Sequence, residues 1–278
     1  MKIEKDVSLK SYNTFGIDAR AKKFVEINTE DDLNELSKLL SDGKEKKRLI
    51  LGGGSNVLFR GDFDGLVIKM SMGGLGLVEE IDDHVLVQSR AGENWHDFVT
   101  WTLQRDYGGL ENLSLIPGNV GAAPMQNIGA YGVEVKDLIE NVEALELETG
   151  EVIYFSNEEC QFGYRDSIFK QWAKDKFLIT AVTFRLKKHP KVNVSYGAIA
   201  STLAEWGIET PDIHDVSRAV VFIRQSKLPD PEVIGNGGSF FKNPVVDTEI
   251  FERLQEEYPK MPFYEVKDKS NEGAEKQS

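Results

Sequence analysis

Long apolar runs, paired cysteines and an excess of positive charge are all missing from this sequence of 278 residues. No run of about 18 apolar residues exists, which argues against a membrane-spanning helix. The N-terminal stretch MKIEKDVSLK has no apolar core of a signal peptide. The single cysteine, Cys160, excludes an intrachain disulfide and agrees with a reducing compartment. We therefore expect a cytoplasmic protein without a membrane partner.

Positive charge is scarce, since 33 Lys and Arg residues stand against 46 Asp and Glu residues and the net charge is −13. This balance disfavours a nucleic-acid partner, because phosphate backbones reward clustered cations. It leaves room for a small anionic ligand, which needs only a few local cations. The four histidines are scattered without metal-ligand spacing, so we predict no metal site.

The residues that are present predict an α+β fold of about two domains. Helical periodicity predicts helices over residues 29–43, 93–109 and 212–226. Alternating or continuous apolar patterns predict strands over residues 48–51, 177–188 and, as a pair, 140–155. Thr29 is the expected N-cap of the first helix and Gly108 the expected C-cap of the second. A composition shift near His189 and Pro190 predicts a domain boundary.

The sequence GGGSN (52–56) follows the first expected strand and suggests a phosphate cradle. No Gly-Lys-Ser/Thr follows, which excludes a P-loop, and Val57 stands where a dinucleotide fingerprint needs its third glycine. The remaining functional interpretation is a nest, in which successive backbone N–H groups converge on an anion. A tight turn between two strands explains the pattern equally well.

The stretch IPGNVGAAPMQNIGAYG (116–132) carries four glycines and three alanines. Such small side chains let a backbone lie flat against a planar ligand, and the amides of Gln126 and Asn127 could match the edge of a heterocycle. The alternative is a loop without function, although loops of this length in compact domains usually bind something.

In GNGGSFFKNP (235–244), a serine stands between Gly238 and Phe240. It belongs either to a plain turn entering a buried strand or to a segment that delivers a hydroxyl into a closed pocket.

Arg165, in FGYRDS, forms either a surface ion pair with Asp166 or an anion site. Arg224 and Lys227 either complement a helix dipole or hold a phosphate.

Six segments in this order closely resemble the UDP-N-acetylenolpyruvoylglucosamine reductases, flavoenzymes of bacterial peptidoglycan synthesis: NTFGI (13–17), LGGGSNVLF (51–59), IPGNVGAAPMQNIGAYG (116–132), FGYRDSIFK (162–170), RQSKLPDP (224–231) and GNGGSFFKNP (235–244). The resemblance runs from about residue 8 to residue 264. It implies an FAD-binding region of the vanillyl-alcohol-oxidase type over residues 1–190, with subdomains of about 1–68 and 69–190. A substrate-binding domain over residues 191–265 would follow. The polar composition of residues 266–278 separately predicts a disordered tail.

The resemblance also implies which residues contact the ligands. FAD, bound non-covalently, would contact Gly52, Gly53, Gly54, Ser55, Asn56, Pro117, Gly118, Gly121, Ala122, Gln126, Asn127, Gly129 and Tyr131. NADPH would be the co-substrate. The UDP-sugar substrate would contact Tyr196, Lys227, Asn243 and Tyr264. Ser239 would be the proton donor, and Arg165 would stabilise the enolate. The glycines would bring the serine hydroxyl within about 3 Å of the carbon that it protonates.

One departure concerns the C-terminus. The family's substrate domain continues past PFYEV and carries a catalytic glutamate, whereas this chain runs into KDKSNEGAEKQS. We therefore expect a C-terminally truncated member of the family, with an incomplete substrate domain and little turnover. We also expect the protein to be a monomer. The competing hypotheses are a non-catalytic flavin- or UDP-sugar-binding protein and an oxidase of the same cofactor superfamily; GSFFKNP and FGYRDS argue against the oxidase.

Overall fold

The computed structural model of the chain describes residues 1–41, 43–239 and 242–263. The chain divides into two compact units, one ending at Gly238 and the other beginning at Ser239. The expectations for Tyr264 and for the tail over residues 266–278 lie outside the described residues. In the part of the chain that the structure describes, no helix is both long and apolar enough to cross a membrane.

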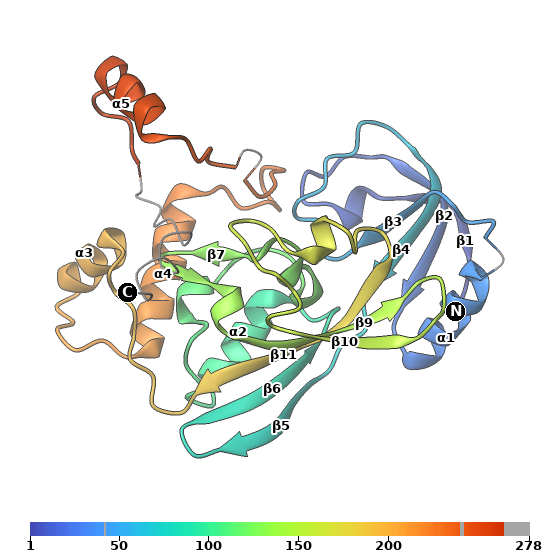
Figure 1. Ribbon diagram of the computed structural model, residues 1–278, viewed down its shortest axis with the longest axis horizontal. Coiled ribbons are helices and arrows are strands. Elements are labelled where there is room, and N and C mark those ends of the chain that lie inside the picture. The colour runs from blue at the N-terminus through green and yellow to red at the C-terminus, as the bar shows by residue number, and fades with distance from the viewer. Residues whose placement is uncertain (42, 240–241, 264–278) are drawn as a thin grey trace, which may run out of the picture. The chain divides into compact units, whose positions relative to one another are not determined.

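The first sheet of the larger unit has four strands in the order β1-β2-β4-β3 (Figure 1). Its strands are β1 (Glu4–Ser8), β2 (Arg20–Ile27), β3 (Arg48–Leu51) and β4 (Phe63–Met70). β4 runs parallel to both of its neighbours, while β1 and β2 are antiparallel. Helix α1 (Glu30–Leu40) connects β2 to β3 and buries Leu33, Leu36 and Leu40. The predicted helix over 29–43 and strand over 48–51 are thus confirmed.

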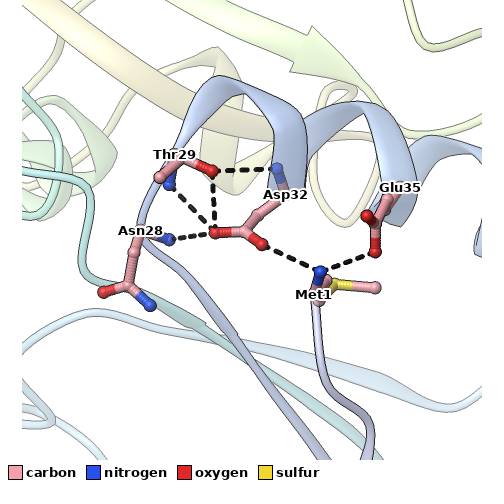
Figure 2. Close-up of polar contacts among 5 residues, drawn as sticks. All are labelled: Met1, Asn28, Thr29, Asp32 and Glu35. Carbon is pink, nitrogen blue, oxygen red and sulfur yellow. Dashed lines mark hydrogen bonds and ion pairs between the residues drawn. The ribbon is translucent and has the colours of Figure 1, made fainter.

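Polar contacts hold the N-terminus of α1 (Figure 2). Thr29 is its N-cap, and Thr29 and Asp32 form a capping box. The carboxylate of Asp32 also accepts from the backbone N–H of Asn28, and this bond is the main cause that lowers the pKa of the Asp32 carboxyl. The amino group of Met1 pairs with Asp32 and Glu35 at 3.1 and 2.6 Å. These contacts tie the start of the chain to α1.

The second sheet has five antiparallel strands in the order β10-β9-β11-β6-β5. They are β5 (Leu75–Ile81), β6 (His84–Arg90), β9 (Ile139–Glu146), β10 (Val152–Ser156) and β11 (Phe177–Lys187). The predicted pair within 140–155 and the strand over 177–188 are confirmed. Helix α2 (Trp95–Leu103) supplies Trp95 and Phe98, whose rings pack against Phe184 of β11 at 6.1 and 4.8 Å between centroids. This aromatic cluster lies in the main core.

The prediction that Gly108 caps the helix over 93–109 is wrong. α2 ends with Gln104 as its C-cap, and the chain then turns through Asp106 at a φ of +57°. Gly108 instead exchanges two backbone hydrogen bonds of 2.9 and 3.0 Å with Lys187. Gly108 therefore forms an antiparallel bridge with the end of β11. The residues around Gly108 in the sequence do not encode this contact.

The remaining elements lie outside the two large sheets. The short strands β7 (Gly129–Ala130) and β8 (Val133–Glu134) pair with each other. Helices α3 (Gly197–Glu205) and α4 (Ile213–Lys227) share a separate core that includes Ile199, Leu203, Val216 and Val220. The predicted helix over 212–226 is confirmed, and the domain boundary near residue 190 stays a prediction. The smaller unit contains α5 (Thr248–Glu257).

Candidate functional site

The GGGSN segment, here named the glycine loop (52–56), begins where the buried end of β3 stops at Leu51. Gly54 is buried and has a φ of +65°, a conformation that disfavours any side chain. A Cβ atom at Gly54 would overlap the carbonyl oxygen of Tyr12 and lie 2.9 Å from the Cα of Asn13. Only glycine therefore allows the loop to pack against the turn that follows β1.

The glycine loop has unpaired backbone donors. The N–H groups of Gly53, Gly54, Ser55 and Asn56 donate no hydrogen bond to any residue that the structure describes. Gly54 is buried, Gly53 and Ser55 are half-buried, and Asn56 is exposed. An unpaired N–H at a buried position such as Gly54 is rare, because losing water without a partner costs free energy. Four consecutive unpaired donors that include a buried one favour the nest over the plain turn, since a nest binds its anion through such donors.

The stretch 116–132, here named the long loop, packs directly against the glycine loop. The hydroxyl of Ser55 donates to the carbonyl oxygen of Pro117 at 3.1 Å. A Cβ atom on Gly53 would lie 2.8 Å from the Cα of Gly118, so the two backbones touch. The N–H of Trp95, at the start of α2, donates to the carbonyl of Gly118 at 3.0 Å and holds the long loop in place. The two glycine-rich segments of the sequence therefore meet at one site.

A cavity of about 330 Å³ lies beside both loops. Its lining comes from β3, the two loops, the ends of β4 and β6, the segment 169–175 and the start of β11. Most of it is apolar, including Ile50, Ala91, Ala122 and Phe177, and the segment 169–175 adds Lys170, Lys174 and Asp175. A nest for a pyrophosphate next to an apolar cavity for a flat ring fits the two chemical parts of a flavin dinucleotide. The residues present are therefore suited to FAD.

The two amides predicted for the long loop differ in their surroundings. Asn127 is buried at a φ of +45°, where its Oδ1 accepts from the N–H of Lys136 and its Nδ2 donates to the carbonyl of Gly163, both at 3.0 Å. Both ends of this amide are thus engaged within the protein, and the side chain fixes the loop. Gln126 is half-buried, and its amide has no hydrogen-bond partner among the described residues.

Arg165 lies close to the long loop. It is half-buried with a φ of +55°, and its guanidinium donates to the carbonyl of Gly129 at 3.1 Å. The alternative ion pair with Asp166 is not formed, because that carboxylate accepts from the N–H of Ser167 and from Gln171. Over the described ranges, Arg165 has no carboxylate within ion-pair distance. A left-handed φ at a bulky non-glycine residue is strained and is typical of functional sites.

Tyr196 lies near the other end of the long loop. It is the N-cap residue of α3, and its ring centroid is 5.1 Å from that of Tyr131 at an interplanar angle of 86°. Arg224 also interacts with Tyr131, and it donates to the carbonyl of Leu115, the residue just before the long loop, at 3.1 Å. Burial lowers the pKa of the Arg224 guanidinium, and Tyr131 opposes that effect. Lys227 is the last residue of α4 and is exposed.

Ser239 and Asn243 belong to the smaller unit, and Tyr264 lies outside the described residues. Sequence reasoning assigned no role to Thr14 and Phe15, although both lie in NTFGI, one of the segments that carry the resemblance. Both contact the segment just before Ser239.

The described residues hold no group of three His, Cys, Asp or Glu side chains placed for a metal ion.

Comparisons with known proteins agree with this geometry. Residues 21–156 match the FAD binding domain family. The chain is 52% identical to the UDP-N-acetylenolpyruvoylglucosamine reductase of Flavobacterium johnsoniae, over 96% of this chain and 78% of that one. It is 50% identical to the same enzyme of Chromobacterium violaceum, over 95% of this chain and 77% of that one.

A solved structure gives a similar result. The crystal structure of UDP-N-acetylenolpyruvylglucosamine reductase from Thermus caldophilus superposes with a TM-score of 0.64 at 25% identity, covering 91% of this chain and 80% of that one. The predicted α+β fold with an FAD-binding region is confirmed, and so is FAD as the cofactor. The vanillyl-alcohol-oxidase type of that region and its division into two subdomains stay predictions.

Proposed function

Because the chain belongs to the UDP-N-acetylenolpyruvoylglucosamine reductase family, we propose that it reduces UDP-N-acetylglucosamine enolpyruvate to UDP-N-acetylmuramate with NADPH as the hydride source. The observation that carries the proposal is the guanidinium of Arg165, which is bonded to Gly129 of the long loop and has no carboxylate partner among the described residues. A cation in that position suits a reaction that develops negative charge beside the cofactor.

The glycine loop would hold the FAD pyrophosphate through its unpaired N–H groups, and the long loop would lie against the flavin. The apolar cavity beside them suits the adenine ring. When bound, FAD supplies the redox chemistry, by which a hydride from NADPH reaches one carbon of the enolpyruvyl double bond. The cofactor is held without a covalent bond, since neither a histidine nor Cys160 lies in a convincing attachment context.

Two side chains would complete the reduction. Arg165 would stabilise the enolate that exists after the substrate has gained the hydride. Ser239 would then transfer its hydroxyl proton to the neighbouring carbon, so that the double bond gains one hydride and one proton. A serine hydroxyl is a weak acid, and this transfer needs it within about 3 Å of the carbon with water excluded.

Four residues would contact the UDP-sugar: Tyr196, Lys227, Asn243 and Tyr264. The edge-to-face contact of Tyr196 with Tyr131 of the long loop supports a substrate position next to the flavin. Lys227 is exposed at the end of α4, where its ammonium would meet a phosphate. We also infer a cytoplasmic monomer that binds no nucleic acid, on the charge balance and the single cysteine of the sequence.

The test asks whether the purified yellow protein oxidises NADPH only when the enolpyruvyl sugar nucleotide is present. We expect slow but substrate-dependent oxidation with formation of the lactyl ether. Oxidation at the same rate without the sugar nucleotide would indicate an oxidase. Binding of both ligands without any oxidation of NADPH would indicate a flavin- and UDP-sugar-binding protein, and either result contradicts the proposal.

A further inference from the structure

The four residues before Ser239 form a segment, here named the strap (235–238), that is hydrogen-bonded to Thr14. The hydroxyl of Thr14 donates to the carbonyl oxygen of Asn236 at 2.6 Å, and the N–H of Asn236 donates back to the carbonyl of Thr14 at 3.0 Å. The N–H of Thr14 donates in turn to the carbonyl of Gly54 at 3.2 Å. Thr14 therefore uses its three polar groups to connect the strap with the glycine loop.

The far end of the strap is also anchored on the glycine loop. The N–H of Gly238 donates to the carbonyl oxygen of Ser55 at 2.8 Å. The side-chain amide of Asn236 donates to the carbonyls of Pro229 and Ile234 at 3.0 and 2.8 Å and so closes the turn that leads into the strap. The last residue before Ser239 is therefore held by the loop whose N–H groups would bind the FAD pyrophosphate.

The glycines of the strap allow this close approach. A Cβ atom on Gly237 would lie 2.6 and 2.8 Å from two carbons of the Phe15 ring, and one on Gly235 would overlap the carbonyl of Phe15. Real Cβ atoms need about 3.5 Å or more from carbon, so no side chain fits at either position. The strap thus lies flat on the turn formed by Thr14 and Phe15.

We propose that Thr14 is a positioning residue for the protonation step, because it fixes the strap and thereby the backbone from which Ser239 projects. This inference rests on the proposed function, in which Ser239 is the proton donor. Consecutive Cα atoms are about 3.8 Å apart, so an anchored Gly238 confines the residue that follows it. Misplacing a reacting group by about 1 Å can slow a step by about 100-fold.

The test compares Thr14→Val with Thr14→Ser and Thr29→Ala in the FAD-saturated full chain. Valine keeps the branched shape of threonine and loses its hydroxyl, whereas serine keeps the donor. Thr29→Ala removes the cap of α1 and lowers stability without touching the strap, so it controls for general destabilisation. Amide hydrogen exchange of residues 234–239 reports on the strap, and stopped-flow absorbance times the two half-reactions separately.

We expect Thr14→Val to raise amide exchange in the strap by about 2- to 12-fold, which corresponds to one lost hydrogen bond. It should slow reoxidation of the reduced flavin by substrate about 10-fold or more and leave its reduction by NADPH unchanged. Thr14→Ser should keep the amide exchange of the strap and the rate of flavin reoxidation at the values of the parent chain. Thr29→Ala should change neither of them.

Unchanged exchange in Thr14→Val would overturn the inference, and so would raised exchange with an unchanged second half-reaction. Equal slowing of both half-reactions would also overturn it, because Thr14 would then shape the flavin site as a whole. A parent chain that binds FAD but shows no second half-reaction contradicts the proposed function itself, and the role of Thr14 in protonation fails with it. The second half-reaction of the unmutated chain therefore distinguishes a failure of the proposed function from a failure of the role proposed for Thr14.

Discussion

Replacing Gly54 by alanine tests whether the glycine loop is the pyrophosphate cradle. Gly54 is buried at a φ of +65°, where an L-residue costs roughly 1–2 kcal/mol. The added Cβ would also overlap the carbonyl oxygen of Tyr12 and lie 2.9 Å from the Cα of Asn13. Since carbon atoms need about 3.5–4.0 Å, relieving the contact with Asn13 alone moves the loop by about 0.6–1.1 Å, and relieving the overlap with the Tyr12 carbonyl requires more.

Such a movement should weaken FAD binding more than it weakens folding. The N–H groups of the loop bind an anion only while they converge on it, and a hydrogen bond to a charged group contributes about 1.5–3 kcal/mol. Losing one such bond should raise the dissociation constant of FAD about 10- to 100-fold. The measurement is a titration of apo-protein with FAD, followed by the quenching of flavin fluorescence.

Gly207→Ala is the matched control. Gly207 has a φ of +71°, close to that of Gly54, but a Cβ atom there would meet nothing within 4 Å. Both variants should lose a similar free energy of unfolding from backbone strain, and only Gly54→Ala should lose FAD affinity. FAD affinity of Gly54→Ala equal to that of Gly207→Ala would refute the assignment of the loop to the pyrophosphate.

Three further predictions concern the cofactor and two side chains. Acid denaturation should release all of the yellow chromophore into the supernatant, and flavin that stays with the precipitate would show a covalent bond. Ser239→Ala should leave flavin reduction by NADPH unchanged and slow only the transfer to substrate in stopped-flow experiments; equal slowing would mean that Ser239 shapes the flavin site. Burial raises the pKa of the Cys160 thiol to about 12 from 9.0. The folded protein should therefore resist thiol reagents at pH 8, and its stability should fall as the pH rises above about 9, where the unfolded thiol loses its proton and the folded thiol keeps it. Rapid labelling of the native protein at pH 8 would contradict this.

Much of the fold followed from local patterns in the sequence. The apolar spacing of α4, the continuous apolar run of β11 and the Thr29 cap of α1 each depend on residues within a few positions of one another. The two glycine-rich loops were also recognisable as candidate ligand segments, because their small side chains and the absence of known fingerprints are properties of the sequence alone. What each loop does was left open by those patterns.

Tertiary contacts decided the rest. Gly108 pairs with Lys187 instead of capping a helix, and the side-chain amide of Asn127 bonds to the backbone of Lys136 and Gly163. The sequence marked the glycines before Ser239 as a place of close backbone approach, but only the fold shows that they approach Phe15 and Ser55. The hydroxyl of Thr14 meets a carbonyl 222 positions away in the chain. A hydrogen bond depends on distance and angle in space, and no pattern of neighbouring residues encodes which distant group will satisfy it.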